Sequence, residues 1–190
     1  ARPAPPATLA KTEPLPAPKG DASAVKSMVA LGPGGADVDI QIPEFAKDMV
    51  SMRLDGRLDE GVWAQVPGYD NMLVMDPDTL ADTRFKTDAR FFYTDEGLYI
   101  GVYMQQPRDT LIARLSSRDE FINRDSIGIT LDTSGEGLYG YWFVVNLGGS
   151  VMDGKVAAER QFSREWDGPW SSGTAELEDG WSAEMFLPWS

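Results

Sequence analysis

The sequence reads TDARFFYTD at residues 87–95, LYIGVYMQQ at 98–106, DSIGITLD at 125–132 and YGYWFVVN at 139–146. Each stretch alternates between apolar side chains and other types, which is typical of β-strands that bury one face. We therefore expect four strands in succession, with the rest of the chain arranged around them. The side chains expected to face the core are Ala89, Phe91, Tyr93, Leu98, Ile100, Val102, Met104, Ile127, Ile129 and Leu131.

The opposite face of these strands combines glycines with large aromatic rings. It would carry Tyr99, Gly101 and Tyr103 on the second strand, Gly128 on the third and Trp142 on the fourth. Rings beside glycines can form a platform for a ligand, but aromatic side chains on strands usually serve packing. Two interpretations stay open: a ligand platform, or a face that a second layer, a partner or a neighbouring loop covers.

The composition limits both the core and the class of partner. With 190 residues and 42% hydrophobic side chains, the chain can bury one good core, so we expect one domain plus appendages. The formal net charge of -13 would repel a phosphate backbone, which argues against nucleic acid as a partner. The sequence has no run of about 18 apolar residues, so no membrane-spanning helix is expected.

The chain contains neither cysteine nor histidine. Disulfides, thiolate metal sites and cysteine nucleophiles are therefore excluded. Without imidazole, Ser-His-Asp catalysis and histidine-ligated zinc or haem are excluded as well. Chemistry based on paired carboxylates remains open, and so does the binding of a hard cation through oxygen ligands.

Residues 1–37 differ in composition from the rest of the chain. They are dominated by Pro, Ala, Lys and Gly, so we expect an extended arm or linker there and a folded domain at residues 38–190. The chain begins with Ala1, as it would after removal of a signal peptide or at the start of an expressed fragment.

Shorter signals surround the four main strands. Residues 38–42 and 51–56 predict short strands, and residues 69–75 predict an edge strand. Asp59 is expected to cap a short helical turn that places Trp63 in the core. A C-terminal hairpin is expected to point Trp181, Ala183, Met185 and Leu187 inward.

Two groups of carboxylates are candidates for a calcium site. Asp76, Asp78 and Asp82 share one acidic loop, whereas Asp119 and Asp125 lie in the charged connection between the second and third strands. The spacing matches no EF-hand loop, and acidic surface loops are common in so negative a chain. A solvated loop is therefore the alternative to calcium.

Two loops could also carry binding residues. The charged connection contains Arg118 and Arg124, which either contact a ligand or form surface ion pairs. The loop at residues 157–173 contains Trp166 and Trp170, which either stack on a sugar ring or close one end of the core.

Five segments in this order resemble carbohydrate-binding module family 9, over residues 50–189. They are LDGRLDEGVW, TDARFFYTDEGLYIGVYM, RDSIGITLD, YWFVVN and EDGWSAEMFLPW. The resemblance implies an all-β, antiparallel β-sandwich of jelly-roll type with a short helical turn, which binds sugars without catalysis and often contains structural calcium. We further expect the subgroup found ahead of an outer-membrane β-barrel, and hence an exported protein of the periplasm or cell surface.

The resemblance also places the family's sugar contacts on this sequence. An aromatic residue, a carboxylate and an arginine of the family fall on Ile122, Gly128 and Val144, so all three are changed, whereas Asp125 and Asn146 match. Three lost contacts at about 1 kcal/mol each would weaken a micromolar site toward millimolar. We therefore expect the family's sugar site to be remodelled or absent.

The first hypothesis is a non-catalytic domain that binds a polysaccharide or oligosaccharide, although family members can be attached to glycoside hydrolases. The alternative is a structural domain that docks on a membrane barrel or a partner protein through the N-terminal arm and the glycine-aromatic face. A glycosidase with paired carboxylates is a third hypothesis. The residues expected to contact a sugar are Trp142, Tyr99, Tyr103, Phe121, Arg118, Arg124 and Asn146.

Overall fold

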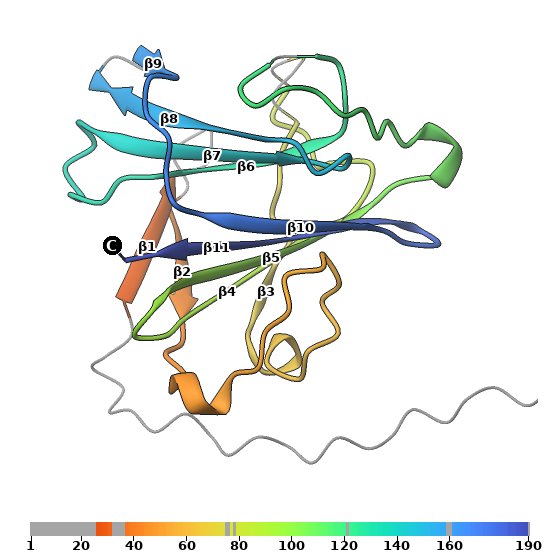
Figure 1. Cartoon of the computed structure of the whole chain (residues 1–190). Helices are drawn as coiled ribbons and strands as arrows, with labels where there is room; N and C mark the ends of the chain where they lie inside the picture. The colour runs from red at the N-terminus through yellow and green to blue at the C-terminus, as the bar shows by residue number, and fades with distance from the viewer. Residues whose placement is uncertain are drawn as a thin grey trace, which may run out of the picture.

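All four strands expected from the alternating stretches are present, but they are divided between two sheets (Figure 1). The computed structural model describes residues 26–31, 37–74, 77, 79–120, 122–158 and 161–189. Both sheets are antiparallel and pack face to face around one core, which confirms the predicted β-sandwich.

The larger sheet has five strands in the order β10-β11-β5-β4-β3. Its strands are β3 (Gly68–Tyr69), β4 (Thr87–Tyr93), β5 (Gly97–Gln105), β10 (Ser171–Glu176) and β11 (Gly180–Pro188). The smaller sheet has four strands in the order β6-β7-β8-β9. They are β6 (Ser126–Leu131), β7 (Gly140–Asn146), β8 (Val151–Ala157) and β9 (Gln161–Ser163).

A third, two-stranded unit precedes the sandwich. It pairs β1 (Lys26–Leu31) with β2 (Asp37–Ile42), so a strand lies inside the segment expected to be an arm. The remainder of that segment, residues 1–25 and 32–36, lies outside the described residues. The described residues also contain three short 3₁₀ turns: η2 (Lys47–Met49), η3 (Trp63–Gln65) and η4 (Arg108–Thr110). In the part of the chain described here, no helix has the length and apolar character needed to cross a membrane.

The core between the sheets is built from the faces that the alternation predicted. The predicted side chains of β4 and β5 are buried, while those of β6 are half-buried because this strand is at the edge of its sheet. The inward side of β11 also agrees with the prediction, since Trp181, Ala183, Met185 and Leu187 are all buried. Period-two patterning therefore located the core face of every one of these strands.

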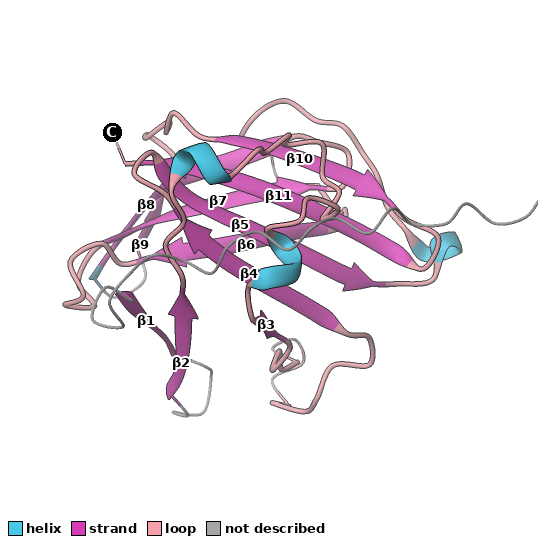
Figure 2. Ribbon diagram, turned by 90° about the horizontal axis from the view of Figure 1, so that it is seen from below, coloured by secondary structure: helices cyan, strands magenta, loops and turns pink. Residues whose placement is uncertain are grey.

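The outer face of the five-stranded sheet is covered by the segment between β2 and β3 (Figure 2). Phe45, Val62, Trp63 and Val66 form a second apolar cluster there with Phe92 of β4. This result decides between the two interpretations of the glycine-aromatic face on β5. A second layer covers much of it, so that part of the face is not an open platform.

Glycine at position 101 lets this covering segment approach the sheet closely. A Cβ atom at Gly101 would lie 2.7 Å from Cδ2 of Leu58 and 2.9 Å from Cη2 of Trp63. Any larger residue would push Leu58 and Trp63 away from the strand. The glycine expected to flank a binding platform therefore serves packing instead.

Three local predictions were wrong. Residues 51–56 form no strand, although the turn at Gly56 is present, with φ of +86°. Asp59 does not cap the helical turn, because η3 begins at Trp63 with Val62 in the capping position. The edge strand expected at residues 69–75 is reduced to β3 and an isolated bridge between Leu73 and Asp82. Tertiary contacts with the sheet determine the conformation of residues 51–75 more than the local sequence pattern does.

Candidate functional site

The sugar-binding residues expected from the sequence do not converge on one site. Tyr99 and Tyr103 are on β5, on the outer face of the five-stranded sheet, whereas Trp142 and Asn146 are on β7 of the other sheet. Phe121 lies outside the described residues. A single site containing all seven residues is therefore wrong, because two packed sheets separate its members.

Tyr99 is held in an aromatic stack. Its ring lies parallel to that of Phe92, with centroids 4.7 Å apart, and its centroid is 4.6 Å from that of Phe186. Both neighbours flank Tyr99 across the sheet, in the register Phe92↔Tyr99↔Phe186. Tyr99 therefore contributes to packing on this sheet, as aromatic cross-strand pairs commonly do.

The outer face of the four-stranded sheet contains a hollow of about 500 Å³, which we call the outer hollow. It is lined by Gly128, Ile129, Thr130, Trp142, Val144, Phe162 and Arg164. Trp142 is only 6% exposed, and its indole Nε1 donates to the carbonyl of Ser163 at 3.2 Å. Phe162 is 61% exposed, and its ring lies edge-on to Trp142 at 6.4 Å. Phe162 thus offers the accessible ring, and Trp142 forms the floor.

Two of the positions to which the resemblance assigns sugar contacts, Gly128 and Val144, lie on this same face. Gly128 and Val144 are direct cross-strand partners in the outer hollow. A Cβ at Gly128 would lie 2.9 Å from Cγ2 of Val144, so the valine occupies space beside the glycine. Neither position supplies the carboxylate or the arginine that the resemblance implies, and the polar side chains that line the outer hollow are Thr130 and Arg164.

Asn146, which matches the family, closes a turn. It is 1% exposed, and its Nδ2 donates to the carbonyl of Ser150 at 2.6 Å while its Oδ1 accepts from the Ser150 amide at 3.4 Å. These bonds close the hairpin between β7 and β8. Both Nδ2 and Oδ1 of Asn146 therefore form hydrogen bonds within the protein.

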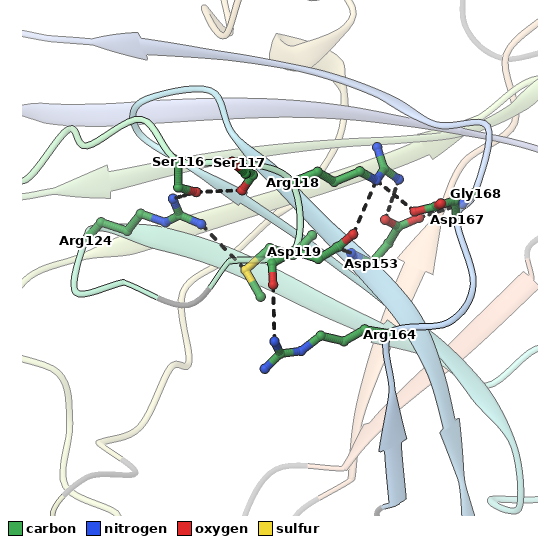
Figure 3. A network of polar contacts seen from close by, with 10 residues as sticks. Ser116, Ser117, Arg118, Asp119, Arg124, Asp153, Arg164, Asp167 and Gly168 are labelled. Atoms are coloured by element: carbon green, nitrogen blue, oxygen red, sulfur yellow. Dashed lines mark hydrogen bonds and ion pairs between the residues drawn. The ribbon is translucent and has the colours of Figure 1, made fainter.

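Arg118 and Arg124 belong to a polar network beside β8 (Figure 3). Arg124 donates to Oγ of Ser116 and, at 2.8 Å, to the carbonyl of Glu120. Arg118 bonds the carboxylates of Asp153 and Asp167, the latter at 2.9 Å. Arg118 is therefore ion-paired, and Arg124 is held by hydrogen bonds to uncharged groups, so both arginines are engaged within the protein.

The same network brings three carboxylates together. Oxygens of Asp119, Asp153 and Asp167 all lie within 4.8 Å of one another, and Asp153 is completely buried. Arg118 pairs with all three, since its Nε is also 3.7 Å from Asp119. As arranged, these residues do not fit a calcium ion, because the guanidinium supplies the positive charge that the cluster requires.

The predicted calcium donors are distributed differently. Asp119 is in the cluster, but Asp125 accepts from the Ile112 amide at 2.6 Å and from Nε2 of Gln106 at 3.2 Å. The pair Asp119 and Asp125 is therefore corrected to a cluster of Asp119 with Asp153 and Asp167. Asp82 is exposed, and Asp76 and Asp78 lie outside the described residues.

The sequence reasoning missed Phe162, Arg164 and Asp153. Phe162 and Arg164 lie within the loop expected at residues 157–173, where the short strand β9 was not expected, and Asp153 lies on β8. The tryptophans of that loop turn inward: Trp166 and Trp170 are half-buried, with ring centroids 5.9 and 5.5 Å from Phe143. Of the two interpretations left open, closure of the core is the one observed.

No protein-family model matches the chain, and no curated protein matches it. Several solved structures match its fold. A carbohydrate-binding module of family 9 from Caldicellulosiruptor kristjanssonii, in complex with cellotriose, has a TM-score of 0.53 and 17% identity over 77% of this chain and 67% of that chain. The complex of a family 9 module from the same organism with glucose gives 0.51 and 17%, over 77% and 69%.

A third structure agrees with these two. A protein from Bacteroides uniformis to which a carbohydrate-binding role is assigned has a TM-score of 0.59 and 11% identity, over 78% of this chain and 72% of that chain. At such identities the likeness concerns the backbone alone. The chain has the β-sandwich fold of a family 9 carbohydrate-binding module.

Proposed function

We propose that this domain binds saccharides without catalysing their conversion, and that the outer hollow holds the sugar. The observation that carries the proposal is the pairing of an exposed ring, Phe162, with a guanidinium, Arg164, in one hollow on the outer face of the four-stranded sheet. The similar modules bind cellotriose and glucose, which supports an oligosaccharide as the ligand.

The lining of the outer hollow offers the two kinds of contact that sugar recognition needs. The apolar CH face of a pyranose can stack on Phe162, and Thr130 and Arg164 can bond ring hydroxyls. These polar groups are few, and Val144 contributes none. We therefore expect dissociation constants nearer millimolar than micromolar.

The same lining argues for binding rather than hydrolysis. None of the described residues that line the outer hollow is a carboxylate. Glycoside hydrolysis requires two carboxyl groups, about 5 to 10 Å apart, on either side of the scissile bond. The glycosidase hypothesis therefore has no support at this site.

Calorimetric titration of the whole chain with glucose and cellotriose tests the proposal. Phe162→Ala should weaken binding roughly three- to tenfold, the loss of one aromatic contact. Tyr139→Ala is the matched control, since Tyr139 is also an exposed aromatic residue but lies outside the outer hollow. Unchanged binding by the Phe162 variant would remove the site from this hollow, and no binding by the unmodified chain to any of a broad glycan panel would reject the function.

Export, with association at the outer membrane, is part of the same proposal and rests on the resemblance to the barrel-associated subgroup. Fractionation of cells that express the natural gene tests it, and recovery only in the cytoplasm would contradict it.

The alternative function, docking on a partner protein, has less surface available than expected, because the segment at residues 45–66 covers much of the glycine-aromatic face. It would depend on the N-terminal arm, so pull-downs with and without residues 1–25 should recover different partners.

A further inference from the structure

A second hollow, of about 560 Å³, lies on the opposite side of the molecule, on the outer face of the five-stranded sheet. We call it the Tyr103 hollow, and its lining includes Glu60, Trp63, Asp88, Arg90, Tyr103 and Ser182. Its volume lies within the range of small-molecule sites, about 300 to 1,000 Å³.

The walls of the Tyr103 hollow are fixed by buried contacts. Trp63 is 1% exposed, and its Nε1 donates to Oε1 of Glu184 at 3.0 Å. The amide of Gly56 donates to the other oxygen of Glu184 at 2.9 Å, and Oγ of Ser182 donates to the Gly56 carbonyl. The covering segment is therefore pinned to β11 at several points, so the hollow is preformed.

Hydrogen bonds within the protein orient the polar side chains of the Tyr103 hollow before any ligand binds. Nε of Arg90 donates to Oδ1 of Asp88 at 3.0 Å, and Nη1 of Arg90 donates to the carbonyl of Trp63. Tyr103 is half-buried, and burial, followed by its hydrogen bond to Asp179, raises the pKa of its hydroxyl to about 12. The phenol therefore stays neutral across the physiological range and presents an uncharged ring.

Glu60 has an unused acceptor at this wall. Its Oε1 accepts from the Arg53 amide at 3.1 Å, but its buried Oε2 accepts a hydrogen bond from none of the described residues. A buried acceptor without a donor is unfavourable, so a rotation of Glu60 that brings Oε2 to a hydroxyl in the hollow would be favoured. The described carboxylates that line the Tyr103 hollow do not form a metal-binding cluster. Among the described residues, that arrangement is found for Asp119, Asp153 and Asp167.

We infer that the Tyr103 hollow is a second saccharide site, so that the domain binds sugar on both faces of its sandwich. A ligand for this lining needs hydroxyl donors for Glu60, oxygen acceptors for Arg90 and an apolar face for Tyr103. A pyranose combines all three. This site differs from the outer hollow in its sheet and in its residues, and its polar lining is the richer of the two.

The two hollows can be read separately in one NMR titration of the whole, ¹⁵N-labelled chain. The Trp63 indole N–H reports on the Tyr103 hollow and the Trp142 indole N–H reports on the outer hollow, because each indole lines its own site. Trp63→Phe and Trp142→Phe assign the two resonances. The probes are cellotriose, xylotriose and maltotriose.

We expect at least one trisaccharide to shift the Trp63 resonance saturably, and Phe162→Ala to leave that titration unchanged. Tyr103→Ala and, independently, Glu60→Gln should weaken it about tenfold, by loss of a ring contact or of the free acceptor. The two variants act through different contacts, so loss of folding in one leaves the other decisive. A shift of Trp142 alone would overturn the second site and leave the outer hollow standing. No shift at either indole with any probe would overturn both.

Discussion

The indole nitrogen of Trp63 donates to a buried carboxyl oxygen of Glu184 at 3.0 Å, although 121 residues separate them in the sequence. Glu184 also accepts from the Gly56 amide at 2.9 Å and is 0% exposed. Through this one side chain, strand β11 holds the segment that covers the outer face of the five-stranded sheet and forms a wall of the Tyr103 hollow.

Glu184 should make the stability of the domain depend on pH. Burial raises the pKa of Glu184 to about 7, above its ordinary value of 4.5, although its bonds to Gly56 and Trp63 oppose the shift. The folded state therefore binds this proton more tightly than the unfolded state. The resulting stabilisation, on the order of 2 kcal/mol, is complete below about pH 4.5 and is lost as the pH rises through 7.

Urea unfolding between pH 4.5 and 8.5 measures this effect. The free energy of unfolding should fall with pH in the unmodified chain, and Glu184→Gln should flatten the slope while lowering stability by about 1 to 3 kcal/mol, since an amide offers only one acceptor oxygen. Equal slopes in the two proteins would show that Glu184 is not the group responsible.

Gly101 should tolerate no side chain. Gly101→Ala would drive a methyl group into Leu58 and Trp63, at 2.7 and 2.9 Å, and we expect a loss of about 1 to 3 kcal/mol. Gly61→Ala is the matched control, because nothing lies within 4 Å of a Cβ there. Thermal unfolding of both variants checks the expectation, and similar melting temperatures would contradict the close approach.

Arg118 should be required to neutralise the cluster of Asp119, Asp153 and Asp167. Arg118→Ala leaves buried Asp153 without its guanidinium partner, and we expect a loss of about 3 kcal/mol. Calcium should then raise the melting temperature of the variant more than that of the unmodified chain, since three carboxylates become available to the ion. A large calcium shift in the unmodified chain, reversed by a chelator, would show that the ion can displace Arg118.

Asn146 should prove to be a turn residue rather than a sugar contact. Asn146→Ala removes both bonds to Ser150, and we expect about 2 kcal/mol of destabilisation. Saccharide affinity, measured well below the melting temperature, should change by less than about threefold. A larger loss of affinity at unchanged stability would return Asn146 to the binding site.

Much of the fold could be predicted because β-structure imposes a period of two on the sequence. The inward faces of β4, β5, β6 and β11 were all located from alternation. The resemblance then supplied the architecture, which the solved family 9 modules share at 17% identity. Neither source predicted that Asp59 caps no helical turn or that residues 51–56 form no strand, because contacts with the sheet outweigh weak local preferences there.

The sites were less predictable, because alternation does not say which strands pair or what covers them. Tyr103 and Trp142 both occupy positions opposite the core face in the alternating pattern of their strands, yet they lie on opposite sides of the sandwich. Phe162, on the short strand β9 that was not expected, supplies the exposed ring of the outer hollow.

By itself, the sequence determined the four central strands, the buried faces of β4, β5, β6 and β11, and the absence of cysteine and histidine chemistry, since these depend on residue type and short-range order. Only the tertiary structure decided that β5 and β6 belong to different sheets, that Trp63 meets Glu184, and that Arg118 stands among three carboxylates. Such contacts join residues that are distant along the chain, and no local pattern encodes them.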